Sequence, residues 1–227
     1  MRPLTDATPK PLLPVRGKPL IEWHIEALAR SGVREIVVNT AWLEERLVAE
    51  LGDGARFGVR LHYSREGRDH GGALETAGGI ATALPWLIDR PEDPFWVVSA
   101  DIHAPGFGFD PGAVQRFAAS TADAHLWLVP NPPYHPRGDF GLDAAGFGLA
   151  DGPGPDGRTW TYANIALCRA ALVSEVVPGT RAALGPLLFQ AMRRRRVTAE
   201  VYGAEWENVG TPEQWRALNP TTQRSGG

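Results

Sequence analysis

Apolar positions along the chain follow two spacings, that of an amphipathic helix and that of a short buried strand. Helical spacing over residues 20–30 predicts a helix that ends at Ser31-Gly32, a typical helix terminus. Further helices are predicted over 41–52, over 185–196, and from Pro212 with Thr211 as the N-cap. Short apolar or alternating runs predict strands at 34–39, 59–64, 95–101, 124–129, 161–168, 197–203 and 205–210.

This order of elements predicts an α/β fold with a Rossmann-like, mostly parallel sheet that carries helices on both faces. Ligands of such sheets bind beyond the carboxyl ends of the strands, which makes Asp101, at the end of the run 95–101, a candidate site residue. We expect one domain over 1–218 and a disordered tail over 219–227. The glycine- and proline-rich stretch 147–160 is interpreted as a surface loop.

The first 15 residues, MRPLTDATPKPLLPV, contain four prolines and follow neither the apolar spacing of a helix nor the alternation of a strand. Because proline lacks a backbone donor and favours an extended preceding residue, the segment is predicted to be a rigid, extended loop. It holds Lys10, and Lys18 follows closely; these are the only two lysines, against 21 arginines. Lysine is a compact point charge that arginine does not replace at a tight phosphate site. Lys10 is therefore a candidate functional residue.

Composition narrows the class of protein. The formal charge of −3 gives no reason to expect nucleic acid or an anionic membrane as a partner. The single cysteine, Cys168, cannot form an internal disulfide, and no apolar run has transmembrane length. We therefore expect a soluble, cytoplasmic protein. The sequence does not indicate an oligomeric state.

Four stretches, taken in order, resemble the sugar-1-phosphate nucleotidyltransferase family: TPKPLLPV (8–15), ETAGGI (75–80), SAD (99–101) and WENVGTPEQW (206–215). The resemblance implies a reaction in which a sugar phosphate attacks the α-phosphate of a nucleoside triphosphate, with Mg²⁺ as cofactor. Members that transfer UMP from UTP to N-acetylmuramate 1-phosphate, with release of pyrophosphate, are the most similar. The alternatives are glucose or mannose 1-phosphate with dTTP or GTP, and a non-catalytic protein that only binds nucleotide sugars.

The resemblance also implies roles for particular residues. Lys10 would contact the reacting phosphates, and Asp101 would be a catalytic residue that holds Mg²⁺. The family reads the nucleobase mainly through the main chain at positions that correspond here to Glu75, Thr76, Gly78 and Gly79. Two polar residues, in the stretches RGDF (137–140) and YANI (162–165), would contact the sugar: Asp139 and Asn164.

Two features depart from the family pattern. The family commonly has an aspartate before VGT as a second metal ligand, whereas this chain has the neutral Asn208. The neighbouring Glu207 is not expected to replace it, because adjacent strand residues face opposite sides. Family members also begin with an apolar strand and a glycine-rich turn, L-A-A-G-x-G-x-R, directly before the residues that match MRPLT. We therefore expect this chain to lack a central strand and the phosphate-binding turn. Either the start is assigned too far downstream, which we favour, or the chain is truncated.

Overall fold

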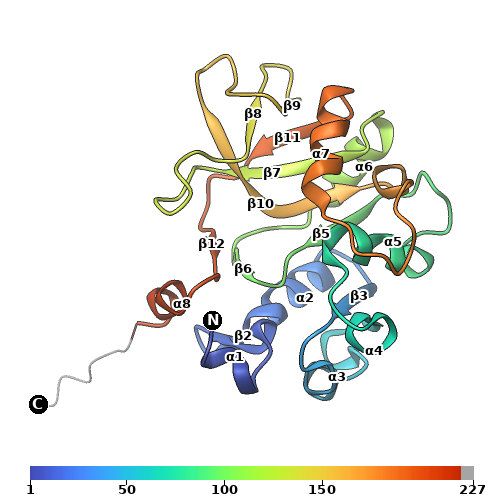
Figure 1. Ribbon diagram of the computed structural model, residues 1–227, viewed down its shortest axis with the longest axis vertical. Coiled ribbons are helices and arrows are strands. Elements are labelled where there is room, and N and C mark those ends of the chain that lie inside the picture. The colour runs from blue at the N-terminus through green and yellow to red at the C-terminus, as the bar shows by residue number, and fades with distance from the viewer. Residues whose placement is uncertain (221–227) are drawn as a thin grey trace, which may run out of the picture.

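The computed structural model describes residues 1–220 (Figure 1). Its helices are α1 (Leu4–Ala7), α2 (Leu20–Arg30), α3 (Glu44–Leu51), α4 (Glu66–His70), α5 (Glu75–Leu87), α6 (Pro111–Ala119), α7 (Leu184–Arg193) and α8 (Pro212–Leu218), with short 3₁₀ helices at Lys10–Leu12, Ala55–Phe57 and Ala170–Val173. The strands are β1 (Pro14–Val15), β2 (Lys18–Pro19), β3 (Glu35–Thr40), β4 (Arg60–Arg65), β5 (Phe95–Val98), β6 (Ile102–His103), β7 (Ala124–Val129), β8 (Phe140–Leu142), β9 (Gly148–Leu149), β10 (Thr159–Cys168), β11 (Val197–Val201) and β12 (Glu207–Asn208).

The main sheet has the order β11-β7-β10-β8-β9, and β5 also pairs with β10. Strand β11 runs parallel to β7, but β10 runs antiparallel to both β7 and β5. Strands β5, β7 and β11 therefore share one direction, and β10 makes the sheet mixed. The predicted α/β class with helices packed on a central sheet is confirmed.

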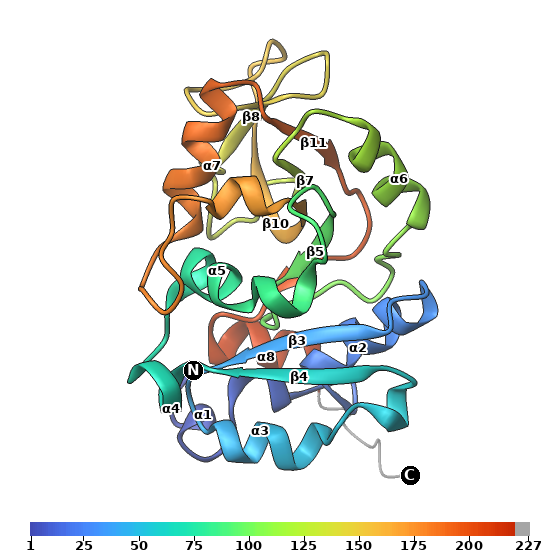
Figure 2. The same ribbon diagram turned by 90° about the vertical axis from the view of Figure 1, so that its right-hand side faces the viewer.

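Both faces of this sheet are buried, as the apolar runs predicted. Leu126 and Leu128 of β7 lie in one core with residues of α5 and α7. The alternate residues Trp127 and Val129 lie in a second core with residues of α2 and α6. Because successive side chains of a strand face opposite sides, β7 contributes to both cores in turn. Figure 2 shows α7 and α6 on opposite sides of the sheet.

The predicted elements agree closely where the local pattern is strong. Helix α2 and strand β7 have the predicted bounds. Helix α3 begins three residues later than predicted, because Leu43 adopts a left-handed conformation with φ of 52°. Helix α6 was not predicted, although Asp110 caps it through the backbone N–H groups of Gly112 and Ala113 and Pro111 follows as its first residue.

The prediction of an extended opening loop was wrong in part. Residues Leu4–Ala7 form one helical turn, and a 3₁₀ turn begins at Lys10. Proline is tolerated in the first turn of a helix, where its missing N–H has no partner to lose. Extended geometry remains at Thr8 and Pro9, between the two turns.

Strands β3 and β4 are not part of the main sheet. Strand β3 pairs with β4 in a separate two-stranded parallel sheet, and no other strand within residues 1–220 pairs with β3. A cavity of about 600 Å³ is lined by consecutive residues of β3 (35–39) and by consecutive residues at β5 (94–100). Since consecutive residues alternate between the faces of a strand, a cavity that reaches all of them runs along the strand edges. Residues of α2 and α5 also line it. We call this cavity the inter-sheet slot.

The C-terminal residues test the predicted N-cap of the last helix and the predicted disordered tail. Helix α8 has the predicted N-cap Thr211, which forms a capping box with Gln214. Asn219, placed in the predicted disordered tail, is held by side-chain hydrogen bonds to Pro14 and Arg16; residues 221–227 lie outside the described residues. The single domain over 1–218 stays a prediction. None of the helices described is long and apolar enough to cross a membrane.

Candidate active site

Lys10 and Asp101, both predicted as site residues, are in direct contact. The Nζ atom of Lys10 lies 2.8 Å from Oδ2 of Asp101, across 91 positions of sequence, and both side chains are about one-third exposed. Lys18, the other lysine, pairs instead with Glu26 and lies 3.8 Å above the centre of the Trp23 ring. The structure therefore gives the two lysines different surroundings. Lys18 pairs with a residue of the adjacent helix α2, whereas Lys10 contacts the segment that joins β5 to β6.

The segment that carries Asp101 is fixed on both sides. The backbone N–H of Ser99 donates to the carbonyl of Asn164 at 3.0 Å. Nε2 of His24, on α2, donates to the carbonyl of Ile102 at 2.8 Å. Burial lowers the pKa of His24 to about 4, so its ring is neutral at pH 7 and acts as a fixed hydrogen-bond donor. Asp101 is thus held between two anchored residues.

Asn208 lies beside Asp101. Strand β12 pairs antiparallel with β6, which places Asn208 opposite Ile102, and the N–H of Val209 donates to the Asp101 carbonyl at 2.8 Å. The side-chain oxygen of Asn208 is buried and accepts no hydrogen bond from residues 1–220. A buried carbonyl oxygen without a partner is costly, and it is suited to a ligand that supplies positive charge.

These groups fit the expected Mg²⁺. No three His, Cys, Asp or Glu side chains cluster as a metal site within the described residues, so the protein does not form a complete cage there. Mg²⁺ does not need one, because it commonly keeps several waters and binds one or two protein oxygens together with substrate phosphates. Asp101 and Asn208 could supply the two protein oxygens.

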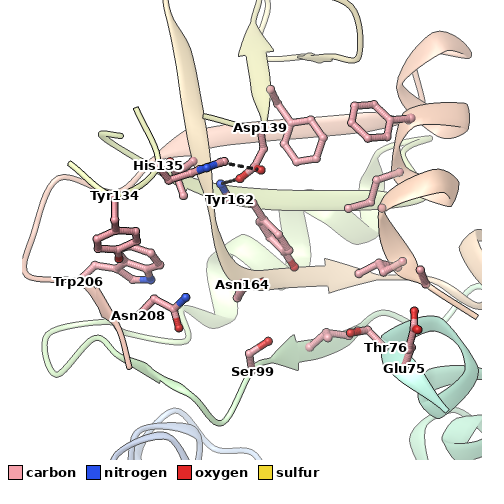
Figure 3. Close-up of a pocket in the computed structure, with 18 residues that line it drawn as sticks. Glu75, Thr76, Ser99, Tyr134, His135, Asp139, Tyr162, Asn164, Trp206 and Asn208 are labelled. Carbon is pink, nitrogen blue, oxygen red and sulfur yellow. Dashed lines mark hydrogen bonds and ion pairs between the residues drawn. The ribbon is translucent and has the colours of Figure 1, made fainter. Parts of the chain in front are cut away.

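A cavity of about 650 Å³ opens between β10, α7 and the start of α5 (Figure 3). Tyr134, Trp206 and Asn208 lie on one side of it, and Glu75 and Thr76 on the other. Its remaining lining is partly polar and partly apolar: Val97, Ser99, His135, Asp139, Phe140, Thr161, Tyr162, Asn164, Ala183, Leu184, Gly185, Leu188 and Phe189. We call it the β10–α7 cavity. Of the predicted site residues, it brings together Glu75, Thr76, Asp139, Asn164 and Asn208.

Asp139 is oriented by two partners. Its Oδ2 atom accepts from the backbone N–H of Tyr162 at 2.8 Å, and its Oδ1 atom lies 3.0 Å from Nε2 of His135. The carboxylate is about one-third exposed, so its remaining lone pairs can accept from a ligand's hydroxyl groups.

Asn164 sits at an irregularity of β10. The register between β10 and β7 shifts between Tyr162 and Ala166, and Asn164 has a left-handed φ of 59°. Such backbone is strained for a residue other than glycine and is concentrated at functional sites. The shift places Asn164 in the lining of the cavity, and the adjacent Ala163 carbonyl accepts from Nε1 of Trp206 at 2.9 Å.

The stretch ETAGGI forms the first part of helix α5. Glu75 and Thr76 line the cavity, and Glu75 forms an ion pair of 2.6 Å with Arg181. The backbone N–H groups of Ala77 and Gly78 both donate to the Ala182 carbonyl. These donors of the first helical turn are therefore already satisfied within the protein.

Gly78 and Gly79 allow close packing in this structure. A Cβ atom at Gly78 would collide with the Thr180 carbonyl oxygen, and one at Gly79 would collide with the side chains of Asn39 and Glu66. Neither glycine lines the β10–α7 cavity. Their contribution here is to bring α5 against its neighbours, and their role in binding a nucleotide stays a prediction.

The sequence interpretation missed the aromatic side of the cavity. Tyr134, His135 and Trp206 all lie close to residues that had been singled out, in the stretches YHPRGD and WENVG. The hydroxyl of Tyr134 donates to Glu207 at 3.0 Å. Burial, followed by the Glu207 carboxylate, raises the pKa of Tyr134 to about 12 and keeps the phenol protonated. Glu207 thus accepts the hydrogen bond of Tyr134; that it does not replace Asn208 as a metal ligand stays a prediction.

Comparison with known proteins identifies the family of this chain. Residues 1–148 match the nucleotidyl transferase family. N-Acetylmuramate alpha-1-phosphate uridylyltransferase of Neisseria meningitidis serogroup B is 43% identical over 216 residues, which are 93% of this chain and 88% of that protein. Glucose-1-phosphate thymidylyltransferase of Streptomyces griseus is 26% identical over 96% of this chain and 61% of its own length. A crystal structure from Bacillus anthracis, assigned as a glucose-1-phosphate thymidylyltransferase, has a TM-score of 0.77 at 19% identity, covering 100% of this chain and 92% of that one; it shows the fold alone.

Proposed function

Since the chain belongs to the nucleotidyl transferase family, we propose that it transfers UMP from UTP to N-acetylmuramate 1-phosphate. The structural observation that carries this proposal is the contact of 2.8 Å between Lys10 and Asp101. Beside it lies the Asn208 side-chain oxygen, which has no hydrogen-bond partner within residues 1–220. These groups come from three distant parts of the sequence and form one cationic and one metal-binding position. Both positions are needed by a reaction that joins two anions.

In this reaction an oxygen of the sugar phosphate forms a bond to the α-phosphorus of UTP, and the bond between the α- and β-phosphates breaks. The products are UDP-N-acetylmuramate and pyrophosphate. Lys10 would hold the two phosphates together and offset their charge, so that attacking and leaving groups stay in line. Asp101 and Asn208 would hold Mg²⁺, which when bound stabilises negative charge on the phosphates.

The β10–α7 cavity is the proposed site for the sugar. Asp139 would accept hydrogen bonds from ring hydroxyls, and Asn164 can both donate and accept. Glu75 and Thr76, at the start of α5, are proposed to contact the nucleotide. We also propose a cytoplasmic location and a role in peptidoglycan recycling, because N-acetylmuramate is a peptidoglycan sugar and UTP is a cytoplasmic substrate.

The test is release of pyrophosphate, with mass-spectrometric identification of the nucleotide sugar. It is made with the chain as it stands and with an extended chain, in which an apolar strand and the turn L-A-A-G-x-G-x-R precede Met1. We expect turnover with UTP and N-acetylmuramate 1-phosphate by the extended chain, and none by the chain as it stands. Faster turnover of glucose or mannose 1-phosphate with dTTP or GTP would assign a different substrate. Binding of a nucleotide sugar without any turnover would indicate a non-catalytic protein.

Replacing Asn208 with aspartate should lower the Mg²⁺ concentration needed for half-maximal activity. The substitution adds a negative charge to a metal ligand, and ligand charge raises affinity for hard cations. The measurement is a Mg²⁺ titration of pyrophosphate release by Asn208→Asp and by the unchanged protein. Glu207→Gln is the matched control, because Glu207 contacts Tyr134 and should leave the requirement unchanged. An unchanged or higher requirement in Asn208→Asp would remove Asn208 from the metal site.

A further inference from the structure

The β10–α7 cavity carries negative charge, although the proposed sugar is itself an anion. Among the 18 residues that line it are the carboxylates Glu75 and Asp139, but no lysine or arginine. N-Acetylmuramate carries a lactyl ether that ends in a carboxylate, in addition to the phosphate. Placing a third carboxylate in a confined site is costly unless a cation or strong donors meet it. Within residues 1–220, His135 is the only side chain of this lining that can carry a positive charge.

The position of His135 leaves one ring nitrogen available. Nε2 is directed at Asp139, 3.0 Å away, and Asp139 is itself fixed by the backbone N–H of Tyr162. In the part of the chain that the structure describes, Nδ1 of His135 forms no hydrogen bond. The ring is 40% exposed beside the cavity. A ligand carboxylate at Nδ1 would therefore meet a ring already oriented by Asp139.

The nearby arginine does not offer the same contact, because Arg181 is paired with Glu75 on the α5 side of the cavity. On the His135 side, the neighbouring Tyr134 directs its hydroxyl at Glu207. Among the described residues that line this side of the cavity, His135 is thus the basic side chain that can meet an acidic substituent.

We propose that His135 determines specificity for the acidic sugar by binding the lactyl carboxylate. This inference rests on the proposed function. In the complex, Nε2–H donates to Asp139 and Nδ1–H donates to the lactyl carboxylate, so that the ring is an imidazolium between two carboxylates. The same site without His135 would still accept N-acetylglucosamine 1-phosphate, which has the same ring and acetamide but no lactyl group.

The test compares kcat/KM for N-acetylmuramate 1-phosphate and N-acetylglucosamine 1-phosphate in His135→Gln and the unchanged protein, each in the chain that is active with UTP. Glutamine keeps a donor for Asp139 but cannot carry a charge. A hydrogen bond to a charged group contributes about 1.5–3 kcal/mol, so we expect a loss of roughly 10- to 100-fold for the muramate substrate. The value for N-acetylglucosamine 1-phosphate should change by less than about threefold, since it makes no such bond.

Tyr134→Phe is the control, because it changes the same side of the cavity without changing a basic group, and it should affect both sugars equally. Equal losses for both sugars in His135→Gln, or no loss, would overturn the inference while the proposed function stands. If the unchanged protein turns over neither sugar, or prefers N-acetylglucosamine 1-phosphate, the proposed function itself fails.

Discussion

The extended chain should unfold in one cooperative thermal transition, whereas the chain as it stands should be poorly soluble or lack such a transition. The reason is the inter-sheet slot, which runs along the edges of β3 and β5 and has residues of α2 and α5 in its lining. Six residues of an apolar strand would bury several side chains there, at roughly 1.5–3 kcal/mol each. That sum is comparable to the whole stability of a domain, about 5–15 kcal/mol.

The measurement is thermal unfolding followed by circular dichroism, with and without UTP and Mg²⁺. Ligand that binds only the folded state should raise the transition temperature of the extended chain. An extension of equal length made of glycine and serine is the control, because it cannot fill an apolar slot and should give no gain. If the unextended chain melts cooperatively and UTP stabilises it, the slot does not require a strand and the prediction is wrong.

Replacing Lys10 with alanine should reduce uridylyl transfer by more than about a hundredfold, the scale expected when a group that stabilises transition-state charge is removed. The fold should be little affected, because the ion pair with Asp101 is partly exposed and such pairs contribute at most about 1 kcal/mol. Both measurements use the extended chain: pyrophosphate release gives the rate, and thermal unfolding of the same variant checks the fold. A smaller loss would indicate that Lys10 does not contact the reacting phosphates.

Lys18→Ala is the matched control for Lys10. It removes the only other lysine, whose charge is satisfied by Glu26 and the Trp23 ring, and it should retain most of the activity. Lys10→Arg separates charge from shape: if a compact point charge is required, arginine should restore only part of the rate. Full activity in Lys10→Arg would mean that positive charge alone suffices at this position.

The sequence alone determined what depends on local spacing and on residue type. Helix α2 and strand β7 follow from the spacing of their apolar residues. Their apolar positions are also the ones that pack in the fold, so the predicted and observed bounds agree. Lys10 and Asp101 were identified by a lysine confined to one segment and by a carboxylate at a strand end. Residue type and position along the chain do not depend on which distant residues come into contact in the fold.

Only the tertiary structure decided which distant groups meet. The antiparallel direction of β10 places the strained Asn164 at the cavity. It also allows Trp206 to donate a hydrogen bond to the carbonyl of Ala163. No local sequence pattern specifies the direction of this strand. Gly78 and Gly79 lie in α5, where the close approach of neighbouring segments, rather than backbone freedom, requires glycine. His135 became a candidate for binding the substrate carboxylate only when the structure showed its contact with Asp139. The role of a histidine depends on the charged groups that the fold places around it.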